Sequence, residues 1–182
     1  MALAVNFSCT ECGAGLHSST PGQASCAACN SGQYQPSTGQ LSCNKCEPGK
    51  EGDGTGLLEE SDACTICERG KFARSSGTPA CIDCGRGFYE PGAAAVACID
   101  CPAGRYSEQQ GSVDGSVCIP CGIGTYGDPG SSACTPCPSG KYLDRGLGNH
   151  STACIDCPLG RFGVQWSAAL FLPLRPTPSR LQ

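Results

Sequence analysis

The chain has 182 residues, of which 18 are cysteine, 26 glycine and 14 proline, and its formal net charge is −4. A cysteine content of about one residue in ten is typical of a disulfide scaffold, and Leu, Ile, Val and Phe together make up less than a fifth of the chain. This composition excludes the core of a Rossmann domain, a TIM barrel or a helical bundle of this length. The sequence also lacks the basic cluster that nucleic-acid binding requires.

Residues 1–8 precede the first cysteine and contain only a short, uncharged apolar run. A signal peptide needs a charged start and an apolar run of roughly 7–15 residues, so we interpret this segment as a leader fragment. The composition is of the secreted type, yet no export signal is visible. We therefore hypothesise that the sequence is an incomplete gene product.

Residues 9–163 form a tandem repeat of nine Cys-x-x-Cys pairs, whose first cysteines are 16 to 21 residues apart. Every second cysteine is followed after three residues by glycine, and in seven units a Tyr or Phe follows after five. His17 and Glu51 are the two exceptions. Most units have another glycine in the middle of the loop: Gly22, Gly39, Gly56, Gly77, Gly92 and Gly130. Such a period indicates an array of structural repeats.

Each part of the unit predicts a local structure. Proline after the second cysteine and glycine at the fourth position, as in residues 101–104, fit a β-turn. The aromatic residue then begins a short extended segment, where its ring can cover a nearby disulfide or the next repeat, and the mid-loop glycine lets the chain reverse. We predict a small disulfide-rich fold: an elongated tandem repeat of short β-hairpin loops, with little helix and a minimal hydrophobic core.

Two disulfide connectivities are compatible with nine pairs. The simpler ladder joins the second cysteine of each pair to the first of the next and leaves Cys9 and Cys157 unpaired. Its bonds are Cys12–Cys26, Cys29–Cys43, Cys46–Cys64, Cys67–Cys81, Cys84–Cys98, Cys101–Cys118, Cys121–Cys134 and Cys137–Cys154. The alternative joins neighbouring pairs first-to-third and second-to-fourth, which leaves one whole pair without a partner. Spacing alone does not decide between the two.

Two other chemistries compete with a disulfide ladder. Cys9, Cys12, Cys26 and Cys29 have a spacing that suits a four-thiolate zinc site. Cys118-Ile-Pro-Cys121 resembles a dithiol redox motif, but no helix is predicted to lower a thiol pKa there. Nine equivalent motifs favour scaffolding over either alternative, and we predict neither a cofactor nor a metal site.

Residues suited to conventional catalysis are few. We expect His17 and His150 to lie in exposed loops rather than to act as bases, and no hydrolase, zinc-protease or phosphate-loop motif is present. The aspartates in the three Cys-Ile-Asp-Cys motifs are interpreted as solvated turn residues: Asp83, Asp100 and Asp156. Asn6 and Asn149 begin Asn-x-Ser sequons and are candidate glycosylation sites. We therefore predict that the chain is not an enzyme.

Residues 164–182 abandon the repeat and are interpreted as a disordered tail. Their apolar stretch, residues 166–174, is shorter than the ~20 residues of a transmembrane helix and is interrupted by Pro173. We expect no membrane insertion by this segment. The abrupt change in composition supports the hypothesis of an incomplete gene model.

The unit Cys-x-x-Cys-x-x-Gly-x-Tyr/Phe resembles the cysteine-rich repeats of ephrin type-A/B receptor-like domains, which are similar to tumour-necrosis-factor-receptor modules and belong with growth-factor-receptor cysteine-rich domains. The resemblance extends from Cys9 to about Phe162 and, by its pairing, favours the first ladder. Two units depart from the pattern: one has His17, and the other has Glu51 with a longer acidic loop at residues 59–62. Looser packing is expected there.

The resemblance implies a non-catalytic segment of an extracellular receptor-like or adhesion protein, or of the ectodomain of a membrane protein. Such a segment acts as a spacer and protein-interaction rod. Its partners are expected to be a protein ligand or neighbouring repeats of a longer chain. The alternatives are an intracellular zinc-binding module and, more remotely, a dithiol oxidoreductase.

Overall fold

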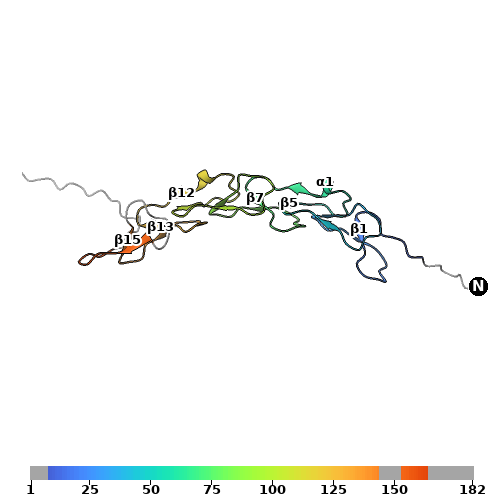
Figure 1. Cartoon of the computed structure of the whole chain (residues 1–182), viewed down its shortest axis with the longest axis horizontal. Helices are drawn as coiled ribbons and strands as arrows, with labels where there is room; N and C mark the ends of the chain where they lie inside the picture. The colour runs from blue at the N-terminus through green and yellow to red at the C-terminus, as the bar shows by residue number, and fades with distance from the viewer. Residues whose placement is uncertain (1–7, 144–152, 164–182) are drawn as a thin grey trace, which may run out of the picture.

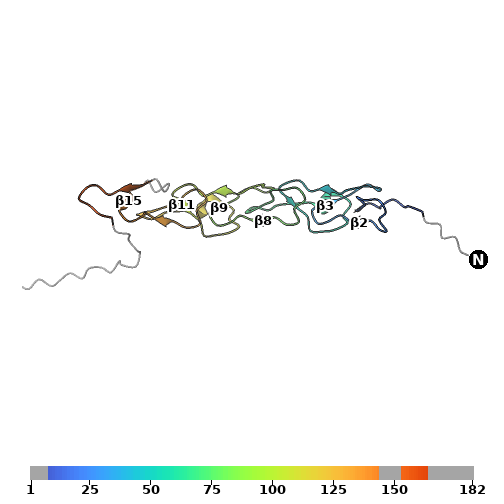
Figure 2. The same cartoon turned by 90° about the horizontal axis from the view of Figure 1, so that it is seen from below.

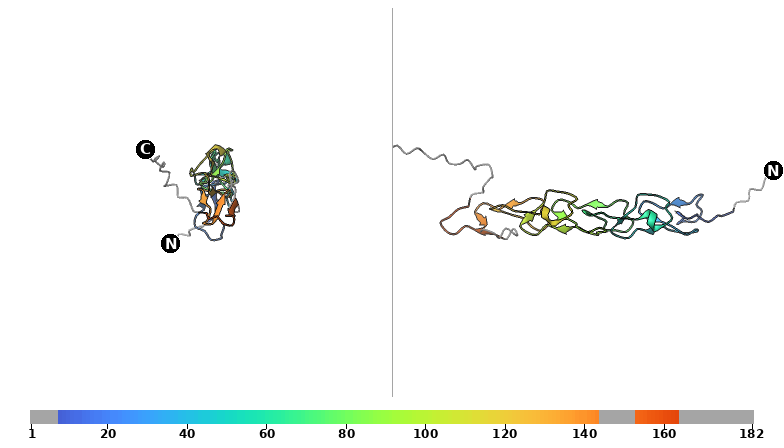
Figure 3. Two further views of the ribbon diagram at one scale, coloured as in Figure 1. Left: turned by 90° about the vertical axis from the view of Figure 1, so that its left-hand side faces the viewer. Right: turned by 90° about the horizontal axis from the view of Figure 1, so that it is seen from above.

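The computed structural model describes residues 8–143 and 153–163, which form a thin, elongated rod (Figure 1). The chain advances along the rod from β1 at one end to β15 at the other, and the same extended shape is seen after rotation (Figure 2). Viewed along its length, the rod has a narrow cross-section (Figure 3). The predicted small disulfide-rich repeat fold is confirmed.

Eight antiparallel two-stranded hairpins build the rod. In each, the residue after the turn glycine and the fifth-position residue pair with the two residues inside the next Cys-x-x-Cys motif; for example, Tyr89 pairs with Ile99. The hairpins are β1 (Leu16–His17) with β2 (Ala27–Ala28), β3 (Gln33–Tyr34) with β4 (Asn44–Lys45), β5 (Lys50–Glu51) with β6 (Thr65–Ile66), β7 (Lys71–Phe72) with β8 (Ile82–Asp83), β9 (Phe88–Tyr89) with β10 (Ile99–Asp100), β11 (Arg105–Tyr106) with β12 (Ile119–Pro120), β13 (Thr125–Tyr126) with β14 (Thr135–Pro136), and β15 (Lys141–Leu143) with β16 (Cys154–Asp156).

The loops contain short helical elements, the four-residue α1 (Glu60–Ala63) and the 3₁₀ turn η1 (Gly115–Val117). Both lie in loops longer than the commonest one, closed by cysteines 18 and 17 residues apart instead of 14. The additional residues are thus accommodated as local helical turns, while the hairpin at the base of each loop is retained.

Backbone hydrogen bonds join consecutive repeats in a recurring pattern. The mid-loop residue of one repeat donates its N–H to the carbonyl of the second cysteine of the preceding repeat, as Gly77 does to Cys46 at 2.8 Å. The turn glycine of one repeat donates to the residue after the fifth position in the next, as Gly70 does to Glu90 at 2.9 Å. Because these bonds involve only main-chain atoms, loop sequences can vary without breaking the connection between repeats.

One mid-loop position differs from the sequence prediction. In the repeat whose second cysteine is Cys84, Ala94 and not Gly92 has the left-handed backbone (φ 57°), and its N–H donates to the Cys67 carbonyl at 2.8 Å. Gly92 instead donates to the Glu90 carboxylate at 2.8 Å. The donor position follows the distance along the loop. In loops of the commonest length it lies ten residues after the second cysteine, as Gly77 lies after Cys67, and in the shorter loop after Cys121 it lies nine residues on, at Gly130.

The centre of the rod consists mainly of sulfur. Five second cysteines are completely buried and form the largest part of the core: Cys29, Cys46, Cys67, Cys84 and Cys101. Most of the other buried side chains are small, such as Ala63 and Ala73. The minimal hydrophobic core predicted from composition is therefore confirmed, and disulfides occupy the positions that aliphatic side chains fill in an ordinary domain.

Candidate functional site

The disulfides form a continuous ladder in which the second cysteine of each pair bonds the first cysteine of the next. The structure contains the eight pairs of the simpler ladder, with Cα–Cα distances of 5.5–5.8 Å, and not the first-to-third alternative. Cys12 bonds Cys26 whereas Cys29 bonds Cys43. The four cysteines with zinc-like spacing are therefore not brought together as free thiolates.

Two cysteines have no disulfide partner. Cys9 is exposed and precedes β1, whereas Cys157 is half-buried and follows β16, so they lie near opposite ends of the rod (Figure 1). Both are the cysteines that the simpler ladder leaves unpaired. The sequon residues Asn6 and Asn149, the second histidine and the segment 164–182 fall outside the described residues.

The fifth-position residues of the first three repeats contact the following repeat. His17 Nδ1 lies 3.4 Å from Cys43 Sγ, the Tyr34 hydroxyl donates to Glu60 at 3.4 Å, and the Glu51 carboxylate accepts from the Cys81 N–H. In these three repeats the fifth-position side chain therefore reaches a disulfide, a loop or a cysteine N–H of the following repeat, including where it is not a Tyr or Phe. The expectation that His17 lies in an exposed loop is wrong, because it is half-buried on β1.

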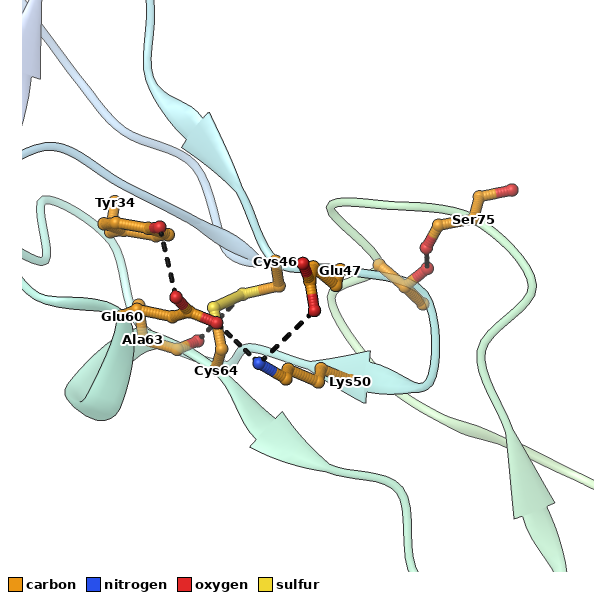
Figure 4. Close-up of a disulfide and its surroundings, with 9 residues drawn as sticks. Tyr34, Cys46, Glu47, Lys50, Glu60, Ala63, Cys64 and Ser75 are labelled. Carbon is orange, nitrogen blue, oxygen red and sulfur yellow. Dashed lines mark hydrogen bonds and ion pairs between the residues drawn. A yellow bond between two sulfur atoms is a disulfide. The ribbon is translucent and has the colours of Figure 1, made fainter. Parts of the chain in front are cut away.

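The acidic loop 59–62 is expected from its sequence to pack loosely, and the structure corrects this expectation. Glu60 accepts hydrogen bonds from Lys50 Nζ at 2.5 Å and from Tyr34 at 3.4 Å, directly beside the Cys46–Cys64 disulfide (Figure 4). Ala63 at the end of α1 is only 2 % exposed, and its carbonyl oxygen lies 3.4 Å from Cys46 Sγ. The longer loop thus places the Ala63 carbonyl beside the Cys46 sulfur and the Glu60 carboxylate between Lys50 and Tyr34.

The same contacts determine the electrostatics of this loop. The hydrogen bond and charge of Lys50 hold the pKa of Glu60 below its usual value, and Glu60 in turn raises the pKa of Lys50. Partial burial, followed by the nearby Glu60 charge, raises the pKa of Tyr34. Near neutral pH, Glu60 is therefore ionised, Lys50 is protonated and Tyr34 is neutral, so that the ion pair and the hydrogen bond to Glu60 can both form.

The recurring aspartates do not converge on a common site. Asp83, Asp100 and Asp156 are exposed, as expected, but they lie on β8, β10 and β16 and not in turns. Two of them make ion pairs across their hairpins, Asp83 with Lys71 at 4.0 Å and Asp156 with Lys141 at 2.8 Å. Their separation along the rod excludes a shared carboxylate centre.

The hairpins also display aliphatic side chains that the sequence reasoning did not single out. Ile82, Ile99 and Ile119 lie opposite the fifth-position aromatic of their own hairpins and are 57 %, 45 % and 52 % exposed. Residues directly opposite in an antiparallel pair share one face. Each of these repeats thus presents an aliphatic–aromatic pair at its surface. The sequence signal for such a pair is an aliphatic residue inside the Cys-x-x-Cys motif.

An open, largely apolar groove of 540 Å³ lies at the C-terminal end of the described rod. Ile123, Tyr142, Leu143 and Phe162 contribute apolar side chains to it, and Cys157 also lines it. The described residues that line the groove include no convergent set of polar groups that would suggest chemistry.

Comparison with protein families gives a repeated match. The model of the family described as tyrosine-protein kinase ephrin type A/B receptor-like matches residues 17–57, 54–96, 70–118 and 124–169. Together these matches cover most of the chain, and each covers about two Cys-x-x-Cys pairs. No curated protein sequence matches the chain. In the part of the chain that the structure describes, no helix has the length and apolar character needed to cross a bilayer.

Proposed function

The chain belongs to the ephrin type-A/B receptor-like family, and we propose that it is a non-catalytic segment of an extracellular receptor-like or adhesion protein. In this role it acts as a disulfide-laddered spacer and as a rod for protein interaction. The proposed partners are a protein ligand or neighbouring repeats of a longer chain. An extracellular location is supported by the eight disulfides, which persist in oxidising compartments.

The observation that carries the spacer role is the continuity of the connection between repeats. Besides the disulfide within each loop, neighbouring repeats share main-chain hydrogen bonds such as those from Gly56 to Cys29 and from Gly111 to Cys84, each 2.8 Å long. A rod joined this way resists bending at every repeat boundary. It therefore holds its two ends apart at a distance proportional to the number of repeats.

The interaction role is supported by the exposed side chains of the hairpins. Ile82, Ile99 and Ile119 are exposed at equivalent positions of three consecutive hairpins. Aliphatic side chains placed at regular intervals along a rod suit contact with an extended protein partner. In contrast, no arrangement of acid, base and nucleophile occurs among the described residues to support a catalytic role.

Small-angle X-ray scattering of the full chain, expressed through a secretory route, tests the spacer role. We expect the scattering of a thin rod together with the eight mapped disulfides, and loss of the rod scattering after complete reduction. A compact particle, or a rod that survives full reduction unchanged, would contradict the proposal. In the latter case, the disulfides would not be what maintains the shape.

The interaction role needs a separate test, in which the chain is displayed on cells and probed with an array of extracellular domains. Ile82→Asp and Ile99→Asp are expected to weaken capture of any partner found, because each places a charge where an apolar contact is proposed. Leu41→Asp is the matched control, since Leu41 is 70 % exposed but lies outside the hairpins. Equal loss in all three variants would contradict recognition by the hairpin faces.

A further inference from the structure

We propose that reduction of the Cys29–Cys43 disulfide opens a metal site in which the two thiolates and the His17 imidazole bind a divalent cation such as Zn²⁺. In the oxidised chain the three side chains already lie together. His17 Nδ1 is 3.4 Å from Cys43 Sγ, and the ligand atoms of all three residues lie within 4.8 Å of one another.

The repeat architecture explains how these residues meet. His17 is the fifth-position residue of the first repeat, on β1, and Cys29–Cys43 is the disulfide of the second repeat. Phe72 has the same relation to Cys84–Cys98, being twelve residues before the first cysteine of the bond, and both bonds span 14 residues. The first repeat thus has a histidine, whose ring can coordinate a metal, at the position where the repeat with Phe72 has a phenylalanine, whose ring cannot.

The chemistry balances with a small dithiol as reductant. Its two thiols transfer two electrons and two protons to the Cys29–Cys43 bond, so that the S–S bond breaks, two cysteine thiols form and the reductant becomes a disulfide. Zn²⁺ then displaces the two thiol protons and forms two bonds to sulfur and one to the neutral imidazole nitrogen. Three protein ligands leave a fourth tetrahedral position for water or another ligand.

Opening this one disulfide leaves other contacts that hold the loop closed. Gln35 is buried, and its side-chain amide donates to the Ser42 carbonyl at 2.8 Å, next to Cys43. The β3–β4 hairpin remains at the base of the loop, and the Cys46 N–H still donates to Gly32 at 2.9 Å. These bonds keep both sulfur atoms near the imidazole, so that little ordering is required when the metal binds.

The burial of the group also suits a cation bound after reduction. Cys29 is fully buried, whereas Cys43 and His17 are half-buried, so a small dithiol and then the metal can approach from the Cys43 side. Two thiolates and one imidazole form a soft to borderline ligand set, which favours Zn²⁺ over Ca²⁺ or Mg²⁺. The site differs from the four-thiolate arrangement considered from the sequence, because it uses one disulfide and a histidine.

Metal titration of the partly reduced full chain tests this proposal. The oxidised chain is treated with limiting dithiothreitol, freed of reductant without air and titrated with Co²⁺, whose thiolate charge-transfer absorption reports binding; Zn²⁺ is then added as a competitor. Acid quenching and alkylation identify which disulfide has opened. We expect one Co²⁺ per opened Cys29–Cys43 bond, displaced by Zn²⁺, and no comparable binding per opened Cys84–Cys98 bond.

Two reciprocal variants separate the imidazole from the thiols. His17→Phe copies the natural repeat with Phe72 and should weaken Co²⁺ binding at least about tenfold, since loss of even an outer partner of a metal ligand costs 10–100-fold. Phe72→His should create a second site at Cys84–Cys98. An unchanged disulfide map of each oxidised variant shows that it has folded.

Three results would each overturn the proposal. Equal Co²⁺ affinity in the wild type and His17→Phe is the first, because the imidazole would then not be a ligand. The second is absence of binding to the wild type once Cys29–Cys43 is open. The third is absence of a second equivalent in Phe72→His once Cys84–Cys98 is open.

Discussion

In the interior of the rod, the turn glycine of one repeat lies against the loop of the repeat two positions further along. A Cβ atom on Gly49, Gly70 or Gly87 would overlap with the main-chain carbonyl of Ala94, Gly111 or Gly130, respectively. Towards the C-terminal end the equivalent glycines have no such neighbour among the described residues: Gly124, Gly140 and Gly160. There the fifth-position Phe162 is 84 % exposed, whereas Phe72 in the interior is half-buried.

The difference shows that one sequence unit has two environments, depending on whether later repeats cover it. Gly70 and Gly124 occupy the same position in their repeats and have nearly the same φ, 80° and 75°, yet only the first is closely covered. Stability in such a rod is therefore a sum of the intrinsic stability of each repeat and of its contacts with neighbours. Substitutions that alter one of these contributions at a time can separate the two.

The largest effect is expected from removing an interior disulfide. The double variants Cys84→Ser/Cys98→Ser and Cys137→Ser/Cys154→Ser each open a loop whose closure contributes about 3 kcal/mol in the chain-entropy model. The first should also increase hydrogen exchange in the repeats on both sides, because the Cys84 carbonyl accepts the Gly111 N–H. The second should affect mainly the C-terminal end. Hydrogen exchange with mass spectrometry measures how far the loss of protection extends from the removed disulfide. If it extended equally far in both variants, interior and C-terminal repeats would not differ in their coupling to neighbours.

Alanine substitution of two turn glycines separates backbone conformation from close contact. Gly124→Ala should cost about 1–2 kcal/mol, the penalty of a left-handed non-glycine residue. Gly70→Ala carries the same penalty and must also displace the Gly111 carbonyl, so it should cost at least about 1 kcal/mol more. Urea unfolding measures both variants. Equal destabilisation would mean that the contact between repeats two apart contributes nothing.

Ala94 provides a test in the opposite direction, because it already occupies a left-handed position. Ala94→Gly removes the steric cost of about 1–2 kcal/mol and adds about 0.5–1 kcal/mol of unfolded-state entropy, for a net stabilisation of about 0.5 kcal/mol. Ala95→Gly is the control. Because Ala95 does not have a positive φ, this substitution should only lower the stability of the protein. The unfolding midpoints of the two variants should therefore shift in opposite directions.

The smallest expected effect concerns the ion pair of the acidic loop. The pKa of Glu60 is lowered by folding, so its contribution is present above its unfolded value of about 4.3 and is lost as pH falls through the lower folded value. The pKa of Lys50 is raised, so its contribution is present below about 10.4 and is lost as pH rises through the higher folded value.

Glu60→Gln should therefore reduce stability slightly at pH 7 and by less at pH 2, because the wild type loses the ion pair as the pH falls through the lowered pKa of Glu60. The urea midpoint at the two pH values measures this difference, which should be smaller than that of either glycine variant, because exposed ion pairs contribute little. Glu59→Gln is the control, since no contact of the Glu59 side chain is observed in the described structure. A pH-independent loss would contradict the ion pair as its cause.

Much of the architecture is predictable because it depends on residues that have few alternatives. Cysteine, glycine and aromatic residues in one register indicate the hairpin repeat, and the predicted helix content and core are confirmed. The roles of the exceptions are not predictable in the same way. Glu51 and the acidic loop that contains Glu60 depart from the repeat unit, and the sequence therefore indicates loose packing there. In the structure, however, Glu51 accepts a hydrogen bond from the Cys81 N–H and Glu60 accepts one from Lys50 Nζ. Such contacts depend on loop paths, which spacing does not encode.

Composition and spacing are sufficient to establish that this protein is a repeat array maintained by cysteine, because the chain cannot supply an aliphatic core and its turn positions require glycine. The contacts of each repeat emerge only in the folded rod. There His17 lies beside a disulfide of the next repeat, Ala94 takes the position expected for Gly92, and the turn glycines lie against loops two repeats away. The physical reason is that these contacts arise from the stacking of successive repeats, and no single repeat contains them.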